Sequence, residues 1–191
     1  MQSEIRIGDK IRQLRELQQV SVEELAERSA TTPELIAGLE AGALVPSLAP
    51  LMKIARALGV RLGTFLDDAE PASPAIVRAG RSERVVRFAG GGSPTTSTLE
   101  MFSLGAGKQD RHMEPFLVEV HPLQDAAPPL SSHEGEEFIY VLRGSVELLY
   151  GSQRHQLAAG DSVYYDSVVP HHLHAVGDAD ATILAVVYAP L

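Results

Sequence analysis

The chain of 191 residues contains no cysteine, and none of its apolar runs approaches the length of a membrane-spanning helix. Without cysteine there are no disulfides, no thiolate catalysis and no Cys-ligated zinc, which fits a cytoplasmic protein. A transmembrane helix needs about 20 predominantly apolar residues, so we expect no membrane partner. The charged stretch MQSEIRIGDKIRQLREL at the N-terminus also lacks the apolar segment of a secretory signal peptide.

Positive charge is scarce and unevenly placed. The formal net charge is −9, from 16 basic and 25 acidic residues. Residues 1–68 hold 8 basic and 10 acidic residues, a balance of −2, whereas residues 69–191 hold 8 and 15, a balance of −7. An acidic surface repels polyanions, so the second part of the chain is a poor candidate for binding nucleic acid.

Residues 1–68 show the apolar spacing of helices and predict a small all-α bundle of about five helices. Capping signals mark the start of a second helix at Ser21 and of a third at Thr32, where Pro33 follows at a position that tolerates proline. A fourth helix is expected over Ser47–Leu58, and a short fifth over Arg61–Leu66.

Residues 69–84 are expected to form a linker, because the stretch DDAEPASP at 67–74 is charged and holds two prolines. Beyond it the apolar period falls toward two, and 85–191 predicts an all-β barrel or sandwich with a turn at 90–94. The expected strands are Val85–Phe88, Thr98–Leu104, Phe116–His121, Glu137–Leu142, Ser145–Tyr150, Asp161–Tyr165 and Thr182–Tyr188. The predicted fold class is therefore α+β, with two domains.

The second and third helices are joined by a short turn at 29–31, which is the helix-turn-helix arrangement. Together with Leu25-Ala26, Glu40-Ala41-Gly42 and the run 51–60, in that order, this makes residues 6–66 resemble the XRE family of helix-turn-helix regulators. The resemblance implies that the third helix, Thr32–Glu40, lies in the major groove of DNA. Its exposed residues would be Thr31, Thr32, Glu34, Ala37 and Gly38.

This reading face departs from the usual chemistry of base recognition. It carries no Arg, Lys, Asn or Gln, and Val22 stands where the family often has a glutamine that contacts the DNA backbone. The alternative is a bundle retained for dimer packing or for shaping a ligand pocket. Phosphate contacts could come from basic residues around the rim, namely Arg6, Lys10, Arg12, Arg15, Arg28 and Lys53.

The second part of the chain holds two separated motifs rich in metal-ligand residues. The first is Ser131-x-His133-x3-Glu137-x6-Gly144, and the second runs from Gly160-Asp161 to Pro170-His171. His, Glu and His on separate strands of a β-barrel are suited to a metal or small-ligand site. In this order the motifs resemble those of the cupin family, over about residues 95–189. The resemblance implies a jelly-roll barrel with His133, Glu137 and His171 facing its cavity.

A full cupin site has a further histidine where this chain has Ser131. The remaining two-His-one-carboxylate set leaves open coordination positions and suits iron(II), with manganese, nickel or zinc as alternatives. The identity of the third ligand is not settled by the sequence, because His172 and His174 share one face of an extended strand. A register slip of one residue would turn that pair inward in place of His171.

A helix-turn-helix domain joined to a cupin resembles a class of transcriptional regulators. This implies a homodimer that binds operator DNA and senses a small-molecule effector in the barrel. The domain order and the His-x3-Glu motif also resemble the hydroxypropylphosphonate epoxidases, which would imply a non-haem iron oxidase or oxygenase. Gln19 falls where those enzymes have a lysine, 96–104 lacks their tyrosine, and an acidic half suits an anionic phosphonate poorly. These differences favour the regulator.

Overall fold

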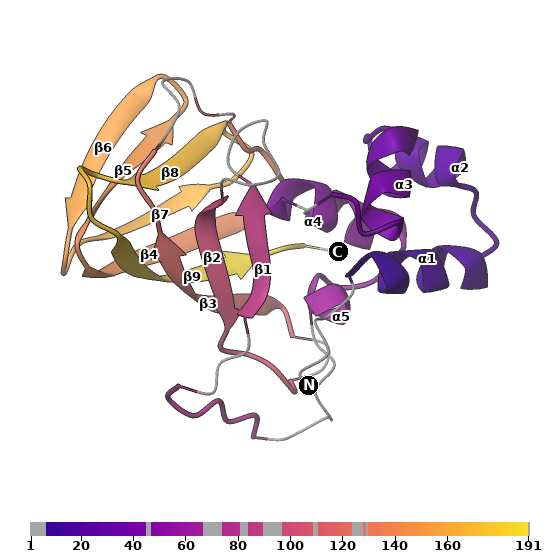
Figure 1. Cartoon of the computed structure of the whole chain (residues 1–191), viewed down its shortest axis with the longest axis horizontal. Coiled ribbons are helices and arrows are strands. Elements are labelled where there is room, and N and C mark those ends of the chain that lie inside the picture. Colours follow the sequence, from indigo (N-terminus) through magenta and orange to yellow (C-terminus); the bar gives the residue numbers. More distant parts are fainter. Residues whose placement is uncertain are drawn as a thin grey trace.

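The computed structural model describes residues 7–44, 47–66, 74–80, 84–89, 97–108, 111–123, 128 and 130–190. A helical part and a β part lie side by side, with one helix, α4 (Leu48–Ala57), pointing toward the barrel (Figure 1). The predicted α+β class is confirmed. The linker expected at 69–84 lies only partly within the described residues, and the turn expected at 90–94 lies outside them. In these ranges no helix has the length and apolar character needed to cross a membrane.

In the ranges that the structure describes, the N-terminal part consists of five short helices. They are α1 (Ile7–Leu17), α2 (Val22–Arg28), α3 (Pro33–Glu40), α4 (Leu48–Ala57) and α5 (Gly63–Leu66). The predicted caps are confirmed, because the Ser21 hydroxyl accepts from the Glu24 amide at 3.0 Å and the Thr32 hydroxyl accepts from the Leu35 amide at 3.2 Å. The fifth helix begins two residues later than expected, at Gly63.

An ion pair between the half-buried Arg15 and the buried Glu40 joins the first and third helices. Arg15 donates from Nε and Nη2 to the two carboxylate oxygens of Glu40 at 2.7 and 2.8 Å, and from Nη1 to the Val20 carbonyl at 3.0 Å. Arg12 donates to the backbone carbonyl of Glu40. This polar cluster is set beside an apolar core that includes Ile11, Leu25, Ile36, Leu51, Ile54 and Phe65, all fully buried.

Within the described residues, the C-terminal part contains nine strands. They are β1 (Arg84–Ala89), β2 (Ser97–Ser103), β3 (Met113–Val120), β4 (Glu136–Arg143), β5 (Ser145–Tyr150), β6 (Gln153–Ala158), β7 (Ser162–Asp166), β8 (His171–Ala175) and β9 (Ala181–Tyr188). They pair antiparallel in a sheet ordered β1-β2-β3-β9-β4-β7 and a second sheet ordered β6-β5-β8. The expected jelly-roll barrel is confirmed.

Two strands were absent from the set expected from sequence. β6 reads QRHQLA and is exposed over nearly its whole length, so it has no apolar face that alternation could reveal. β8 is the opposite case, because four of its five residues are buried and polar histidines occupy inward positions. In the other strands the alternation is regular, as in β9, where Ala181, Ile183, Ala185 and Val187 are buried.

The helical part contacts the barrel through α4 and α5. Gly63 packs so closely on the barrel that an added Cβ would lie 2.8 Å from the Arg111 guanidinium. That guanidinium donates to Glu114 at 2.7 Å, and both side chains are buried. On α4, Arg56 forms an ion pair with Glu134 of the loop that precedes β4.

The Arg15–Glu40 pair gives a test of the helical core. Glu40→Gln removes the buried carboxylate that accepts two hydrogen bonds from the half-buried guanidinium of Arg15, so we expect the free energy of unfolding of the helical domain to fall by about 2 kcal/mol. Denaturant unfolding followed by helical circular dichroism measures this. Glu24→Gln is the matched control, because it removes an exposed partner of Arg28 and should change stability far less. Equal stabilities for the two variants would contradict the assignment.

A candidate metal and ligand site in the barrel

The loop at 131–135 places the first candidate ligand. Gly135 adopts φ +111°, and an added Cβ would lie 2.0 Å from the Tyr188 carbonyl oxygen, so only glycine fits. Ser131 and His171 exchange backbone hydrogen bonds of 2.7 and 2.9 Å, and the His133 amide donates to the Ser167 carbonyl at 3.0 Å. The loop is thereby fixed against β8, with the His133 side chain buried beside the start of β4.

Three buried side chains converge in the barrel. Nε2 of His133 lies 2.9 Å from Oε1 of Glu137, and Nε2 of His171 lies 3.5 Å from the same oxygen. One ligand atom from each residue falls within 4.8 Å of the other two. The structure thus brings together the three residues proposed from the motifs. His172 and His174 are not members of this group, and their ring centroids lie 5.6 Å from each other. His171 is therefore the histidine of β8 that meets His133 and Glu137.

The backbone determines which nitrogen of each imidazole faces the site. Nδ1 of His133 lies 3.2 Å from the Glu134 carbonyl, and Nδ1 of His171 lies 2.8 Å from the Val169 carbonyl. A carbonyl oxygen can only accept, so Nδ1 carries the hydrogen and Nε2 of each neutral ring presents a lone pair.

This leaves electron-pair donors facing each other inside the barrel. Nε2 of His133 is buried and has no partner in hydrogen-bonding geometry, although Oε1 of Glu137 is close to it. A divalent cation placed among two such nitrogens and a carboxylate satisfies all three donors at once. The residues present therefore fit a divalent metal ion.

Glu137 is held as an anion by its surroundings. Burial raises the pKa of a carboxyl group. When His133 and His171 also carry a proton on Nε2, their hydrogen bonds and charge outweigh burial and keep the pKa of Glu137 well below its usual range. Tyr165 donates to Oε2 at 2.8 Å and Ser167 donates to Oε1 at 3.2 Å. Burial and the adjacent carboxylate raise the pKa of Tyr165 well above its ordinary value, so its hydroxyl remains a donor.

Tyr165 and Ser167 were not among the residues proposed from sequence. Tyr165 ends one of the expected strands, and the β4–β7 register sets it directly opposite Glu137. Only the pairing of two strands that are about 28 positions apart in the chain reveals this contact. The signal available in the sequence was the alternation of β7, which places Tyr165 on its buried face.

A cavity of about 450 Å³ opens above the three converging side chains. Its barrel wall is mainly apolar and includes Leu99, Met101, Val118, Ile139, Ile183 and Val187. Part of its lining comes from the other domain, namely Ser47, Leu48, Ala49, Pro50 and Lys53 at the start of α4. The cavity is therefore shared between the helical domain and the barrel, an arrangement that local sequence patterns could not show.

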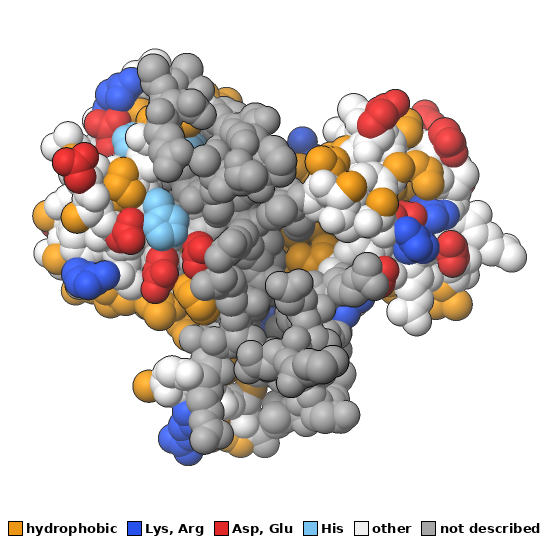
Figure 2. Space-filling view, viewed as in Figure 1, with side chains coloured by type: hydrophobic (Ala, Val, Ile, Leu, Met, Phe, Trp, Pro, Cys, Tyr) orange, Lys and Arg blue, Asp and Glu red, His pale blue; other side chains and the backbone are white. Residues whose placement is uncertain are grey.

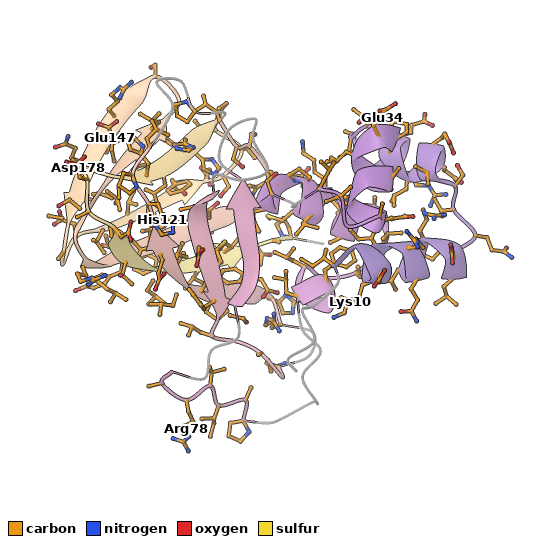
Figure 3. The ribbon with its side chains drawn as sticks, in the orientation of Figure 1. Lys10, Glu34, Arg78, His121, Glu147 and Asp178 are labelled. Atoms are coloured by element: carbon orange, nitrogen blue, oxygen red, sulfur yellow. The ribbon has the colours of Figure 1, made fainter. Side chains whose placement is uncertain are left out.

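The residues proposed to read DNA differ in how they are presented on α3. Thr32, Glu34 and Ala37 are exposed, and Glu34 projects from the helical domain away from the barrel (Figure 3). Thr31 is half-buried, with its hydroxyl 2.8 Å from that of Ser29. Gly38 lies beneath Leu44, since an added Cβ would approach that side chain to 2.5 Å.

Charge on the helical domain is mixed. In the view of Figure 2, acidic and basic side chains alternate over its visible face and form no single basic patch. Three of the arginines proposed as phosphate contacts have acidic partners within the domain, because Arg12 and Arg15 contact Glu40 and Arg28 pairs with Glu24. The basic rim available to DNA is therefore smaller than the composition indicated.

Both parts of the chain match known protein families. Residues 11–65 match the helix-turn-helix family and residues 116–187 match the cupin domain family. The chain therefore combines an XRE-type helix-turn-helix domain with a cupin domain.

Similar proteins span nearly the whole chain. The HTH-type transcriptional regulator PuuR of Escherichia coli (strain K12) is 24% identical over 165 residues, covering 86% of this chain and 84% of its own length. An HTH_3 family transcriptional regulator from Vibrio cholerae has a similar structure, with a TM-score of 0.69 at 22% identity, covering 98% of this chain and 97% of its own. The FeII form of HppE also has a similar structure, with a TM-score of 0.51 at 24% identity, covering 98% of this chain and 100% of its own. At these identities the structural likenesses establish the fold.

The converging side chains give a direct test of metal binding. A divalent metal at 100 times its dissociation constant should raise the stability of the metal-free protein by about 2.7 kcal/mol. Thermal unfolding and calorimetric titration with iron(II) under anaerobic conditions, and with manganese(II), nickel(II) and zinc(II), measure this. Glu137→Gln should abolish the effect, because the site loses its only negative charge.

The control for this experiment is His174→Ala, which removes a histidine of the same strand that lies outside the cluster. It should bind metal as the unaltered protein does. Metal binding that survives Glu137→Gln but is lost in His174→Ala would show that the site lies elsewhere.

Proposed function

We propose that this protein is a ligand-responsive transcriptional regulator. Its helix-turn-helix domain binds operator DNA, and its cupin barrel binds a small-molecule effector at a divalent-metal site. The observation that carries the proposal is the shared cavity, in which α4 of the helical domain forms part of the wall. The similarity to the HTH-type transcriptional regulator PuuR, which extends over 86% of this chain, supports it.

On the DNA side, α3 is the recognition helix, with Thr31, Thr32, Glu34, Ala37 and Gly38 as the residues nearest the bases. The residues that remain exposed on this face are uncharged or acidic, so each domain alone would bind phosphates weakly. A homodimer compensates because two linked recognition helices bind with an effective concentration that raises overall affinity. A protein that binds an operator shares the compartment of that DNA, and we therefore propose a cytoplasmic location.

In the barrel, His133, Glu137 and His171 would hold the metal. Iron(II) suits a two-His-one-carboxylate set best, with manganese, nickel or zinc as alternatives. Bound there, the metal would supply a Lewis-acid attachment point for an effector. The chain itself orients both imidazoles through the carbonyls of Glu134 and Val169 and keeps Glu137 ionised through Tyr165 and Ser167.

Signalling would follow from a shift in population between two arrangements of the domains. An effector changes that balance only if it binds one arrangement more tightly than the other. An effector in the shared cavity meets this condition, because it contacts α4 only while the helical domain is docked on the barrel. The spacing of the two recognition helices in the dimer would change with docking.

A second candidate, an iron-dependent oxidase or oxygenase, is supported by the convergence of the same three ligands. Its open coordination positions could serve oxygen chemistry as well as effector binding. One measurement distinguishes the enzyme from the regulator. Substrate-dependent oxygen consumption by the iron-loaded protein, abolished by His133→Ala, would favour the enzyme over the regulator.

The regulator predicts sequence-specific DNA binding at low salt. Fluorescence anisotropy with DNA from upstream of its own gene should show binding above that of unrelated DNA. Ala37→Glu places a negative charge on the exposed face of α3 and should weaken binding by about ten-fold or more, because it faces the phosphates.

The matched control is Ala179→Glu, which adds the same charge to an exposed loop of the barrel and should leave DNA affinity nearly unchanged. The proposal fails if no DNA binds above the non-specific background, or if both variants bind as the unaltered protein does.

A further inference from the structure

The shared cavity contains two groups of opposite charge, and they come from different domains. Glu137 lies at the floor, on β4 of the barrel, and Lys53 belongs to α4 of the helical domain. If one of these groups is already paired within the protein, a ligand interacts mainly with the other. The unpaired group therefore determines which charge of ligand the cavity accepts.

Glu137 is already engaged. Its two oxygens accept from Tyr165 and Ser167 and face the Nε2 atoms of His133 and His171. Any cation held by the two histidines would neutralise it further. Glu137 therefore offers little to an incoming cationic ligand.

Lys53 is in the opposite situation. Its side chain is exposed at the cavity wall, and it forms no ion pair within the part of the chain that the structure describes. Its neighbour Arg56 is paired with Glu134 and does not line the cavity. Among the described lysines and arginines, Lys53 is the one that lines the cavity. An ammonium group attracts anions and gains most where water is partly excluded.

The start of α4 adds positive potential on the same side. Ser47, Leu48 and Ala49 line the cavity, the first turn holds no acidic residue, and the Ser47 side chain makes no capping hydrogen bond. Amide groups at a helix N-terminus favour negative charge. The remaining wall is apolar, built from residues such as Met101, Val118, Ile139 and Ile183.

We propose that the cavity binds a small carboxylate ligand, whose acid group is held by Lys53 and whose apolar body lies against the barrel wall. Lys53 is then the residue that determines specificity for an anion, and the ligand contacts both domains at once. The inference rests on the proposed function of a ligand-responsive regulator and names the class of its effector.

The proposal also revises an expectation from composition. The excess of acidic residues in 69–191 argued against an anionic ligand, but charge summed over a segment does not describe a cavity. Here the basic group comes from residues 47–53, outside that segment, while most acidic residues of the barrel do not line the cavity.

The same helix connects the ligand to the metal loop. Arg56 follows Lys53 by one helical turn and pairs with Glu134, whose backbone carbonyl is the partner of His133 Nδ1. A carboxylate bound by Lys53 would therefore hold α4 against the loop that carries a candidate metal ligand.

The test uses the full-length protein, with and without saturating manganese(II), and no DNA. The probes are straight-chain carboxylates of about four to eight carbons, a length chosen for a cavity at the small end of ligand pockets, with the amides and amines of equal length. Calorimetric titration and thermal shift should detect the carboxylates and give no response to the amides or amines.

Variants assign the effect to the ammonium group. Lys53→Gln should weaken carboxylate binding by about ten-fold or more, because a charge-assisted hydrogen bond is lost. Lys53→Arg should retain most of the affinity. Lys108→Gln removes the same charge from an exposed lysine that does not line the cavity and should leave affinity unchanged.

Three results would overturn the proposal: tighter binding of the amines than of the carboxylates, unchanged carboxylate affinity in Lys53→Gln, or no binding of any carboxylate in the series. Because DNA is absent, these results are independent of operator binding. Carboxylate binding without DNA binding would sustain the inference about the ligand while removing the regulator. Operator binding without carboxylate binding would sustain the proposed regulator and overturn the inference about its ligand.

Discussion

A carboxylate inside an apolar barrel costs several kcal/mol unless donors or cations surround it. Glu137 meets this requirement through elements that are separate in the chain. Tyr165 of β7 and Ser167 beyond it donate hydrogen bonds, and a proton or metal cation held at Nε2 of His171 on β8 and of His133 in the preceding loop would supply positive charge. Each of these elements must therefore be in place before the charge is tolerated. The position of the cavity above the cluster follows from the same requirement, since Glu137 and both histidines form part of its lining.

The second organising feature is that α4 contributes both to the core of the helical domain and to the wall of the cavity. Leu51, Ile54 and Ala55 on one side are buried in the helical core, while Ser47 and Lys53 line the barrel cavity. A rigid helix of 10 residues cannot move at the cavity without moving the helical core attached to it. Binding of the proposed effector in the cavity would thus be linked to the position of α3 by packing alone.

Much of the fold and the three candidate ligands could be predicted from the sequence, because helix caps, apolar periods and the spacing around His133 and Glu137 are local signals. What could not be predicted depends on contacts across the chain. Tyr165 required the β4–β7 register, and β6 carries no apolar face. The acidic partner of Arg12 and Arg15, Glu40, lies about 25 positions or more away. The contribution of Lys53 to the cavity depends on how the domains dock.

The contact between Gly63 and the Arg111–Glu114 pair has a consequence for how easily the domains separate. Arg111 finds hydrogen-bond partners in Glu114 and in the carbonyls of Gly105 and Lys108, all within the β part. If α5 withdraws, the Arg111–Glu114 pair keeps these partners and gains water, so separation at this contact leaves no buried charge unpaired. Separation at α4 is different, because it breaks the ion pair between Arg56 and Glu134. The electrostatic cost of separating the domains therefore arises at α4, beside the cavity, and not at α5.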